Sequence, residues 1–360
     1  MTQALDRVRQ ATRLRKKEWF TALFHHITVD TLRTAVYALK RKAAPGVDGV
    51  TWQDYEAELD RKLEDLHRRV QRGAYRPQPS RRSYIAKTDG KQRPLAIGAL
   101  ENKIVQGATV MVLNAIYDVV GFSYGFRPGR RPHDALDALS TAIKTRKVNW
   151  ILDADIRDFF GTVNRDWLAR FLGDRTGDKR ITHLIQKWLR AGIFEDGIVT
   201  VDDQGTGQGS VISPLLANIY LHYCFDLWAE RWRRREARGD MIVVRYADDL
   251  VLGFEYESDA RRFLDAMRDR LGKFALSLHP DKTRLIQFGR FAATDRKRRG
   301  LGKPETFAFL GFTFICGRSH RGNFQLQRKP GATACEESWG TLRRSCGVGC
   351  IIPFLSRGDG

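Results

Sequence analysis

Two adjacent aspartates stand between two short apolar runs in residues 241–254. Runs this short, rich in Val and Ile, are typical of buried strands, and Tyr246-Ala247-Asp248-Asp249 between them predicts a tight hairpin turn. Two carboxylates held side by side repel each other unless a cation lies between them. Oxygen ligands favour Mg²⁺, so the pattern predicts a divalent metal site. The alternative is an ordinary exposed Asp-Asp turn.

A third carboxylate for such a site is expected from residues 150–160, where an apolar strand runs into acids and then into two phenylalanines. Asp153 and Asp155 share one face of the predicted strand, because strand side chains alternate. Asp158 follows a little further along. These three acids compete for the role of metal ligand, and a capped strand end is the alternative.

The charge of the chain narrows the class of partner. Its 360 residues contain 62 Lys and Arg against 42 Asp and Glu, a formal net charge of +20. Such an excess favours binding of a polyanion, RNA or DNA. An anionic membrane surface is the competitor, but no apolar stretch approaches the roughly 18 residues of a spanning helix, so no membrane association is expected.

The cysteines and the N-terminal residues indicate the cellular compartment. Five cysteines at irregular spacing fit neither a disulfide framework nor a zinc site. The first residues are basic but have no apolar core behind them, so no secretory signal is predicted. We expect a cytoplasmic protein with reduced thiols.

Hydrophobic periodicity places the elements that must position the acids. Helices are expected over 31–39, 55–73, 101–117, 132–147, 165–172, 181–192, 215–223 and 258–274. Two strands joined at Asp89-Gly90 predict a hairpin over 81–97, and 306–314 is a further strand or hairpin. Residues 290–303 are basic and contain glycine, and we expect an exposed loop there. Basic residues at 7–17 predict either a solvated helix face or a nucleic-acid-binding arm.

Three further stretches suit a nucleic acid or a nucleotide. The hairpin over 81–97 presents cations that suit a triphosphate or a phosphate backbone, with a solvated hairpin as the alternative. Residues 123–131 interleave aromatic rings with arginines, which suits base stacking and phosphate contacts. The Gly-rich run in 204–218 permits close approach of a backbone to a ligand.

Taken together, the blocks resemble the reverse transcriptase domain of group II intron-encoded proteins over roughly residues 30–328. The resemblance rests on collinear motifs: APGVDGVTW, KTDGKQRPLAI with NKIVQ, GFSYGFRPGR with HDAL, LDADIRDFFGTVN, GQGSVISPLLANIYLHY, RYADDLVLGF, LHPDKT and FAFLGFTF. It implies an α+β fold, a right-hand polymerase with fingers and palm, in which helices back an antiparallel palm sheet.

The resemblance also implies a domain order. Residues 1–29 would form a basic arm, 30–147 the fingers with part of the palm, and 148–328 the palm with the catalytic core. The resemblance ends near residue 328, so we expect the thumb to be truncated or absent. A poorly ordered tail over 329–360 is expected in its place.

Carried over motif by motif, the resemblance assigns the acids. The first palm acid precedes Ile-x-x-Phe-Phe, which selects Asp155, and Asp248 and Asp249 complete the metal-binding set. Two Mg²⁺ ions are expected, with Mn²⁺ as a substitute, to activate a primer 3′-OH and to hold the triphosphate. Lys282 matches a candidate proton donor to pyrophosphate.

The substrate-binding residues follow in the same way. Phe160 matches the ribose gate, whose ring would exclude a 2′-OH. Gln208 and Gly209 match the pair that lines the dNTP, and Lys91 and Arg93 match the residues that meet the triphosphate. The implied partners are an RNA template, a DNA primer and dNTPs.

Departures from the family pattern keep a second function open. Gly98, Gly161 and Gly207 stand where Pro, Asp and Pro are usual. The first hypothesis is RNA-directed DNA synthesis. The second is an RNA-binding splicing helper, a maturase remnant of a degenerate mobile element with weak or no polymerase activity. An RNA-directed RNA polymerase is disfavoured by Tyr-Ala-Asp-Asp together with Phe160.

Overall fold

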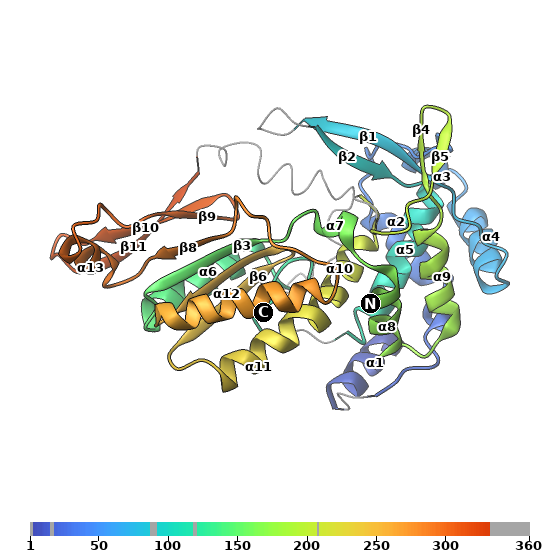
Figure 1. The fold of residues 1–360 in the computed structure, drawn as a ribbon. Coiled ribbons are helices and arrows are strands. Elements are labelled where there is room, and N and C mark those ends of the chain that lie inside the picture. Colours follow the sequence, from blue (N-terminus) through green and yellow to red (C-terminus); the bar gives the residue numbers. More distant parts are fainter. Residues whose placement is uncertain (1–2, 15–17, 87–91, 118–120, 207–208, 332–360) are drawn as a thin grey trace, which may run out of the picture. The chain divides into compact units, whose positions relative to one another are not determined.

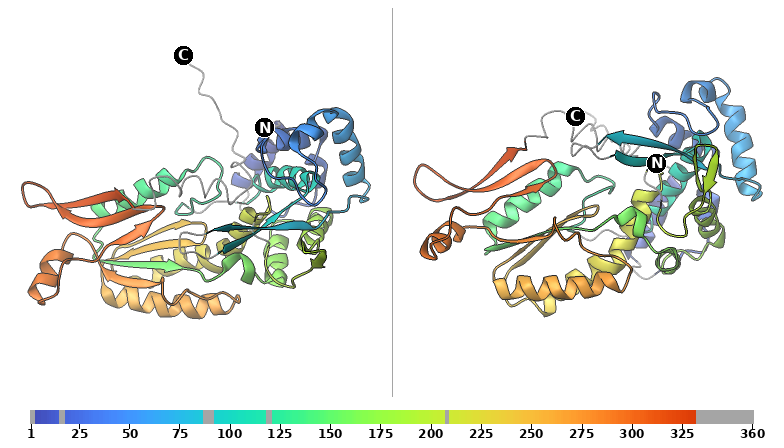
Figure 2. Two further views of the ribbon diagram at one scale, coloured as in Figure 1. Left: turned by 90° about the horizontal axis from the view of Figure 1, so that it is seen from above. Right: turned by 45° about the horizontal axis from the view of Figure 1, so that its top comes forward.

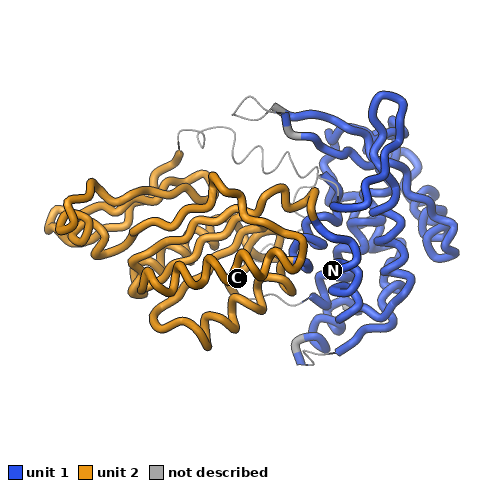
Figure 3. The backbone as a smooth tube through the Cα atoms, in the orientation of Figure 1, with its two compact units in different colours: residues 1–118, 163–220, 342–360 blue, residues 119–162, 221–341 orange. Residues whose placement is uncertain are grey.

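A computed structural model describes residues 3–14, 18–86, 92–117, 121–206 and 209–331. Figure 1 shows the elements, and Figure 3 shows the two compact units into which the chain divides. The first unit contains residues 1–118, 163–220 and 342–360, and the second contains 119–162 and 221–341. Both contain helices and strands, so the predicted α+β class is confirmed.

The first unit combines a helical core with a small sheet. Its sheet has the strand order β2 (Gln92–Ile97), β1 (Ser80–Ala86), β4 (Ile193–Glu195), β5 (Ile198–Thr200). Its helices are α1 (Gln3–Leu14), η1 (Phe24–His26), α2 (Val29–Ala38), α3 (Trp52–Glu56), α4 (Leu59–Gln71), α5 (Leu100–Leu113), α8 (Arg165–Gly173), α9 (Lys179–Leu189) and α10 (Ser213–Leu221), the last residue of which already belongs to the second unit.

Helix α5 is the centre of the first unit, because nearly all of its residues are buried. The helix expected over 55–73 is divided into α3 and α4, because Glu58 leaves the helical conformation between them. β1 and β2 pair antiparallel, which confirms the two strands of the predicted hairpin. The turn that joins them, residues 87–91, lies outside the described residues.

The second unit is built on an antiparallel sheet. Its strand order is β6 (Met241–Tyr246), β7 (Asp249–Phe254), β3 (Trp150–Asp155), β8 (Arg284–Gln287). Around it lie α6 (Pro132–Thr145), α7 (Phe159–Thr162), the π-helix η2 (His222–Asp226), α11 (Leu227–Arg235) and α12 (Glu257–Gly272). A second, three-stranded sheet contains β9 (Phe307–Phe309), β10 (Phe312–Arg318) and β11 (Phe324–Pro330), so residues 306–314 form a hairpin as predicted.

The two faces of the main sheet bury different helices, as Figure 2 shows from above. On one face, Leu136 and Leu139 of α6 join Val244 and Val251 in the core. On the other, Phe263 of α12 packs against aromatic rings that include Phe254 of β7 and Trp232 of α11. Because alternate residues of each strand point to opposite faces, both faces can be apolar while the strand ends carry polar groups.

The expected loop over 290–303 is wrong in part, because it contains helix α13 (Ala292–Arg298). Ala292 is buried and anchors the first turn. Asp295 lies in the first turn and three basic residues lie in the last, an order that complements the helix dipole. Gly300 then takes a φ of +70°, which suits the end of a helix. These signals are readable from the sequence once the basic run is considered as a helix end.

Two further predictions concern the tail and the association with membranes. Most of the predicted tail, residues 332–360, lies outside the described residues. Among the helices that are described, none combines the length and the apolar character that crossing a bilayer would need.

Candidate active site

Acids from two distant segments meet at one end of the main sheet. The antiparallel register of β3 and β7 sets Asp155 directly opposite Asp249. On the other side of β7, Asp249 pairs with Tyr246 of β6. Directly opposite residues share a face of the sheet, with Cβ atoms about 5 Å apart. The structure therefore brings Asp155 and the acidic hairpin together.

Asp248 stands in the two-residue turn between β6 and β7. Ala247, the other residue of that turn, has a φ of +56°. A residue with a Cβ rarely adopts this conformation, and a positive φ at the first central position is the pattern of a type II′ hairpin turn. The turn therefore directs Asp248 to the end of the sheet beside Asp249.

Two acids of β3 have cationic partners. Oδ2 of Asp155 accepts a hydrogen bond from Nζ of Lys282 at 2.8 Å, and Oδ2 of Asp153 accepts one from Arg284 at 3.3 Å. Burial raises the pKa of Asp153, although Arg284 opposes the shift. Asp155 stands at the strand end opposite Asp249, whereas Asp153 stands opposite Val251. Of the two, Asp155 is the one that joins the hairpin acids.

Lys282 reaches Asp155 because its loop is attached to the end of β3. The backbone N–H of His279 donates to the carbonyl of Asp155 at 2.8 Å, and that of Thr283 donates to the carbonyl of His279 at 3.0 Å. This turn returns the chain so that Lys282 projects back over the strand end. The ion pair with Asp155 raises the pKa of Lys282 above its ordinary value, although partial desolvation opposes the shift.

The crowded acids make ionisation of Asp249 unfavourable. Its pKa is raised to about 8, first because neighbouring atoms desolvate the carboxylate and then because Asp248, Asp155 and Asp153 add negative charge nearby. Lys282 opposes the shift. The residue as a whole is exposed at the strand end, so we expect the charge repulsion to be the more persistent cause in solution.

This donor set fits a hard divalent cation. It offers carboxylate oxygens, the ligands that Mg²⁺ prefers, and its mutual repulsion is the kind that a bound cation relieves. Within the described residues, no three Asp, Glu, His or Cys side chains are already arranged as a metal cage. The ammonium of Lys282 instead supplies positive charge at Asp155. A metal ion bound to the same carboxylate would lie beside this ammonium.

Phe160 lies just beyond the acids, in the short helix α7. It is half-buried, and its ring meets the buried ring of Phe159 edge-on, with centroids 5.6 Å apart. Asp158, which the sequence left as a possible ligand, begins this turn with a φ of +40°. A Cβ on Gly161 would meet the carboxylate of Asp158, an exposed side chain that can turn away.

Four predicted substrate-binding residues lie in the first unit. Lys91 and Gln208 fall outside the described residues, and of Arg93 the structure describes the backbone, opposite Ile85 in the β1–β2 hairpin. Gly209 has a φ of +104°, and a Cβ there would lie 2.7 Å from the carbonyl oxygen of Ala96 in β2. The glycine loop therefore lies directly against the strand that carries Arg93.

A buried ion pair behind the acidic turn was not predicted from the sequence. Arg245 of β6 and Asp226 of η2 have fully buried side chains, joined through Nη2 and Oδ2 at 2.6 Å. Burial alone would raise the pKa of Asp226, but Arg245 and His222 outweigh it and hold the pKa below its ordinary value. The readable signal was an arginine inside an otherwise apolar strand, next to the acids.

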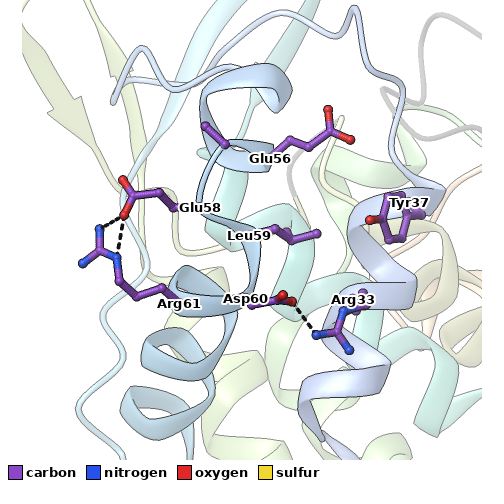
Figure 4. Close-up of a pocket in the computed structure, with 8 residues that line it drawn as sticks. Arg33, Tyr37, Glu56, Glu58, Leu59, Asp60 and Arg61 are labelled. Atoms are coloured by element: carbon purple, nitrogen blue, oxygen red, sulfur yellow. Dashed lines mark hydrogen bonds and ion pairs between the residues drawn. The ribbon is translucent and has the colours of Figure 1, made fainter.

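A pocket of about 640 Å³ lies elsewhere, over α2, α3 and the start of α4 (Figure 4). Arg33 pairs with Asp60 and Arg61 pairs with Glu58 along its walls. Exposed ion pairs of this kind are common surface features. We assign no role to this pocket.

The sequence of the chain is similar to those of known reverse transcriptases and their relatives. Residues 85–314, more than half of the chain, match the family described as reverse transcriptase (RNA-dependent DNA polymerase). Protein YkfC of Escherichia coli (strain K12) is 31% identical over 317 residues, which cover 78% of this chain and 78% of that protein.

Two relatives carry the word intron in their names. The group II intron-encoded protein LtrA of Lactococcus lactis subsp. cremoris is 32% identical over 222 residues, covering 61% of this chain and 37% of the relative. An uncharacterized 91 kDa protein in cob intron of Schizosaccharomyces pombe is 42% identical over 213 residues, covering 58% of this chain and 26% of the relative. The chain thus matches less than half the length of either one. It belongs to the reverse transcriptase family, with a reverse transcriptase domain like that of group II intron proteins.

Proposed function

We propose that the chain is an RNA-directed DNA polymerase that adds deoxynucleotides to a primer 3′-OH on an RNA template. The observation that carries this proposal is the pairing of Asp155 with Asp249 beside the turn that holds Asp248. Membership of the reverse transcriptase family supports it. In this proposal residues 30–147 form the fingers with part of the palm, 148–328 form the catalytic palm, and 1–29 form a basic arm.

The three acids would hold two divalent ions, Mg²⁺ or Mn²⁺. When bound, such ions lower the pKa of the attacking hydroxyl and neutralise the charge of the triphosphate. Asp155 and Asp248 would be the principal ligands, and Asp249, which pairs with Asp155 across the sheet, would contribute less directly. The raised pKa of Asp249 makes its carboxylate harder to ionise than an ordinary one, and a bound cation would lower that pKa.

Other residues would bind the nucleotide and complete the transfer. Lys282 would leave Asp155 and donate a proton to the departing pyrophosphate. Phe160 would lie under C2′ of the sugar and exclude a 2′-OH. We propose that Lys91 and Arg93 bind the triphosphate, and that Gln208 and Gly209 line the base and sugar.

The test is primer extension on poly(rA)/oligo(dT), with Asp248→Asn as the matched variant. We expect incorporation of dTTP that requires Mg²⁺ and falls by at least about 10³-fold in Asp248→Asn, because the metal site then loses a charged ligand. Asp137→Asn, which changes an exposed acid of α6, should extend primers as the wild type does. Wild-type protein that binds RNA but incorporates no dTTP would overturn the polymerase proposal.

A second candidate is an RNA-binding splicing helper, which the net charge of +20 favours equally well. Counterion release makes such binding fall steeply with salt. A measured loss of RNA affinity of about 10³-fold between 50 and 200 mM salt, without any dTTP incorporation, would select this function. A flat salt response would exclude it.

A further inference from the structure

Arg245 links three segments of the second unit through one guanidinium. Its Nε donates to Oδ1 of Asp226 at 2.7 Å, and its Nη2 donates to Oδ2 of Asp226 at 2.6 Å and to Oγ of Ser123 at 2.7 Å. Its Nη1 donates to the backbone carbonyl of Ala247 at 2.9 Å. That carbonyl belongs to the peptide bond that joins Ala247 to Asp248.

The turn that receives this hydrogen bond is strained. Ala247 has a φ of +56°, a conformation that costs free energy in a residue with a Cβ and that persists only where the surroundings impose it. Fixing the carbonyl of Ala247 fixes the peptide plane before Asp248. Arg245 therefore acts directly on the backbone that orients the Asp248 carboxylate.

A second set of contacts with β6 and its turn comes from residues 122–125. The N–H of Tyr124 donates to the carbonyl of Arg245 at 2.8 Å, and the N–H of Arg245 donates to the carbonyl of Phe122 at 2.9 Å. A Cβ on Gly125 would overlap the backbone nitrogen of Ala247 and lie 3.0 Å from its Cα. Residues 122–125 thus pair with β6 and then pass directly against the turn.

Stability alone is a poor explanation for this arrangement. A buried ion pair is often no more stabilising than well-packed apolar residues of similar volume. What the pair adds is direction, because the planar fork of arginine binds carboxylate and carbonyl oxygens at fixed angles. Asp226 is supplied by a π-helix, an uncommon geometry that occurs frequently at functional sites.

We propose that Arg245, held by Asp226 and Ser123, is a positioning residue that fixes the turn carrying Asp248. This inference rests on the proposed polymerase function, since it gives the turn a catalytic purpose. Arg245 itself does not touch substrate. Its effect passes through the carbonyl of Ala247 to the orientation of Asp248.

The test uses two variants of the full chain. Arg245→Lys keeps the charge but cannot reach Asp226 and Ala247 together, and the double variant Arg245→Met/Asp226→Leu replaces the pair by apolar side chains that leave no buried charge. Arg262→Lys is the matched control, because Arg262 donates to the buried Asp259 and to the carbonyl of Glu236, neither of which belongs to the network of Arg245.

We expect both test variants to lower kcat by about 100-fold, the usual cost of a displaced catalytic group, with KM for primer–template unchanged. The Mg²⁺ concentration for half-maximal rate should rise about 10-fold, as it does when residues behind a metal ligand are lost. Arg262→Lys should keep the wild-type values. Folded test variants with wild-type kcat and Mg²⁺ dependence would overturn the proposal.

Amide hydrogen exchange makes the test independent of polymerase activity. In both test variants, the amides of Tyr124 and residue 245, whose hydrogen bonds join residues 122–124 to β6 beside the turn, should exchange at least about 10-fold faster than in the wild type, while those of β3 stay protected. Unchanged exchange at these two amides would overturn the positioning role even if the wild type extended no primer. Absence of primer extension with faster exchange would refute the polymerase function and leave the positioning of the turn supported.

Discussion

Nζ of Lys282 lies 2.8 Å from Oδ2 of Asp155, at the strand end where Asp249 stands opposite. The ammonium therefore supplies positive charge beside the acids. A divalent ion bound at Asp155 would lie beside this ammonium and be repelled by it. In the proposed mechanism, that repulsion would move the lysine towards the reacting phosphates, to which it would donate a proton.

Replacement of Lys282 should separate its effect on metal binding from its proposed role as a proton donor. We expect Lys282→Met to lower the single-turnover rate of dTTP incorporation by about 100-fold, because a general acid is lost. Divalent binding in the absence of substrate should become tighter, because the competing ammonium is gone. Lys282→Arg should have an intermediate rate and keep wild-type Mn²⁺ affinity in a titration. An unchanged rate in Lys282→Met would remove the proton-donor role.

The raised pKa of Asp249 predicts that the free energy of unfolding depends on pH in metal-free buffer. Its folded pKa of about 8 is above the ordinary value of 3.8, so between these values the native state holds a proton that the unfolded chain releases. The free energy of unfolding contributed by this group is therefore full below pH 4 and is lost as the pH rises through 8.

Asp249→Asn should therefore gain stability relative to wild type as the pH rises. Because the residue is exposed and screened by solvent, we expect a gain in Tm of about 2 °C at pH 9 and none at pH 4. Scanning calorimetry in EDTA measures the difference, and saturating Mg²⁺ should abolish it. Equal Tm differences at both pH values would argue against the raised pKa.

Gly209 lies in the Gly-rich loop, and Gly197, between β4 and β5, is its matched control. Both have a positive φ, but a Cβ on Gly209 would lie 2.7 Å from a backbone oxygen, whereas one on Gly197 would meet nothing within 4 Å. We expect Gly197→Ala to cost about 1 kcal/mol of unfolding free energy and Gly209→Ala about 2–3 kcal/mol, by urea titration. Only Gly209→Ala should raise KM for dTTP; equal effects would place the loop away from the nucleotide.

Phe160 should control the choice of sugar. We expect Phe160→Val to reduce the preference for dTTP over UTP by about 10–100-fold, because the ring that would collide with a 2′-OH is removed. Phe291→Val, at an exposed phenylalanine of the same unit, is the control. The measurement is the ratio of kcat/KM for the two nucleotides, and an unchanged ratio in Phe160→Val would assign the gate to another residue.

Local patterns predicted the elements well, because helical spacing and strand alternation depend on near neighbours. The helix over 132–147 and the strands beside Asp248 are examples, observed as α6, β6 and β7. The residues themselves predicted that a carboxylate from 150–160 joins the hairpin acids, but only the resemblance selected Asp155, since no local pattern specifies which residues of two strands become neighbours.

The network around Arg245 could not be predicted in the same way. Its partners Asp226 and Ser123 are 19 and 122 residues away in sequence, and each looks ordinary by itself. A buried charge is recognised as paired only when the fold supplies its partner. The strain at Ala247 was hidden for a related reason, because alanine gives no local sign of a positive φ.

In the π-helix η2, the number of residues is as important as their identity. Each residue of an α-helix turns the following side chain by about 100°, so deleting one residue within 222–226 would rotate Asp226 away from Arg245. Such a deletion would leave every acid of the site in the sequence. It would nevertheless disturb the acids, because it would turn Asp226 away from Arg245. None of the acids lies in η2 itself.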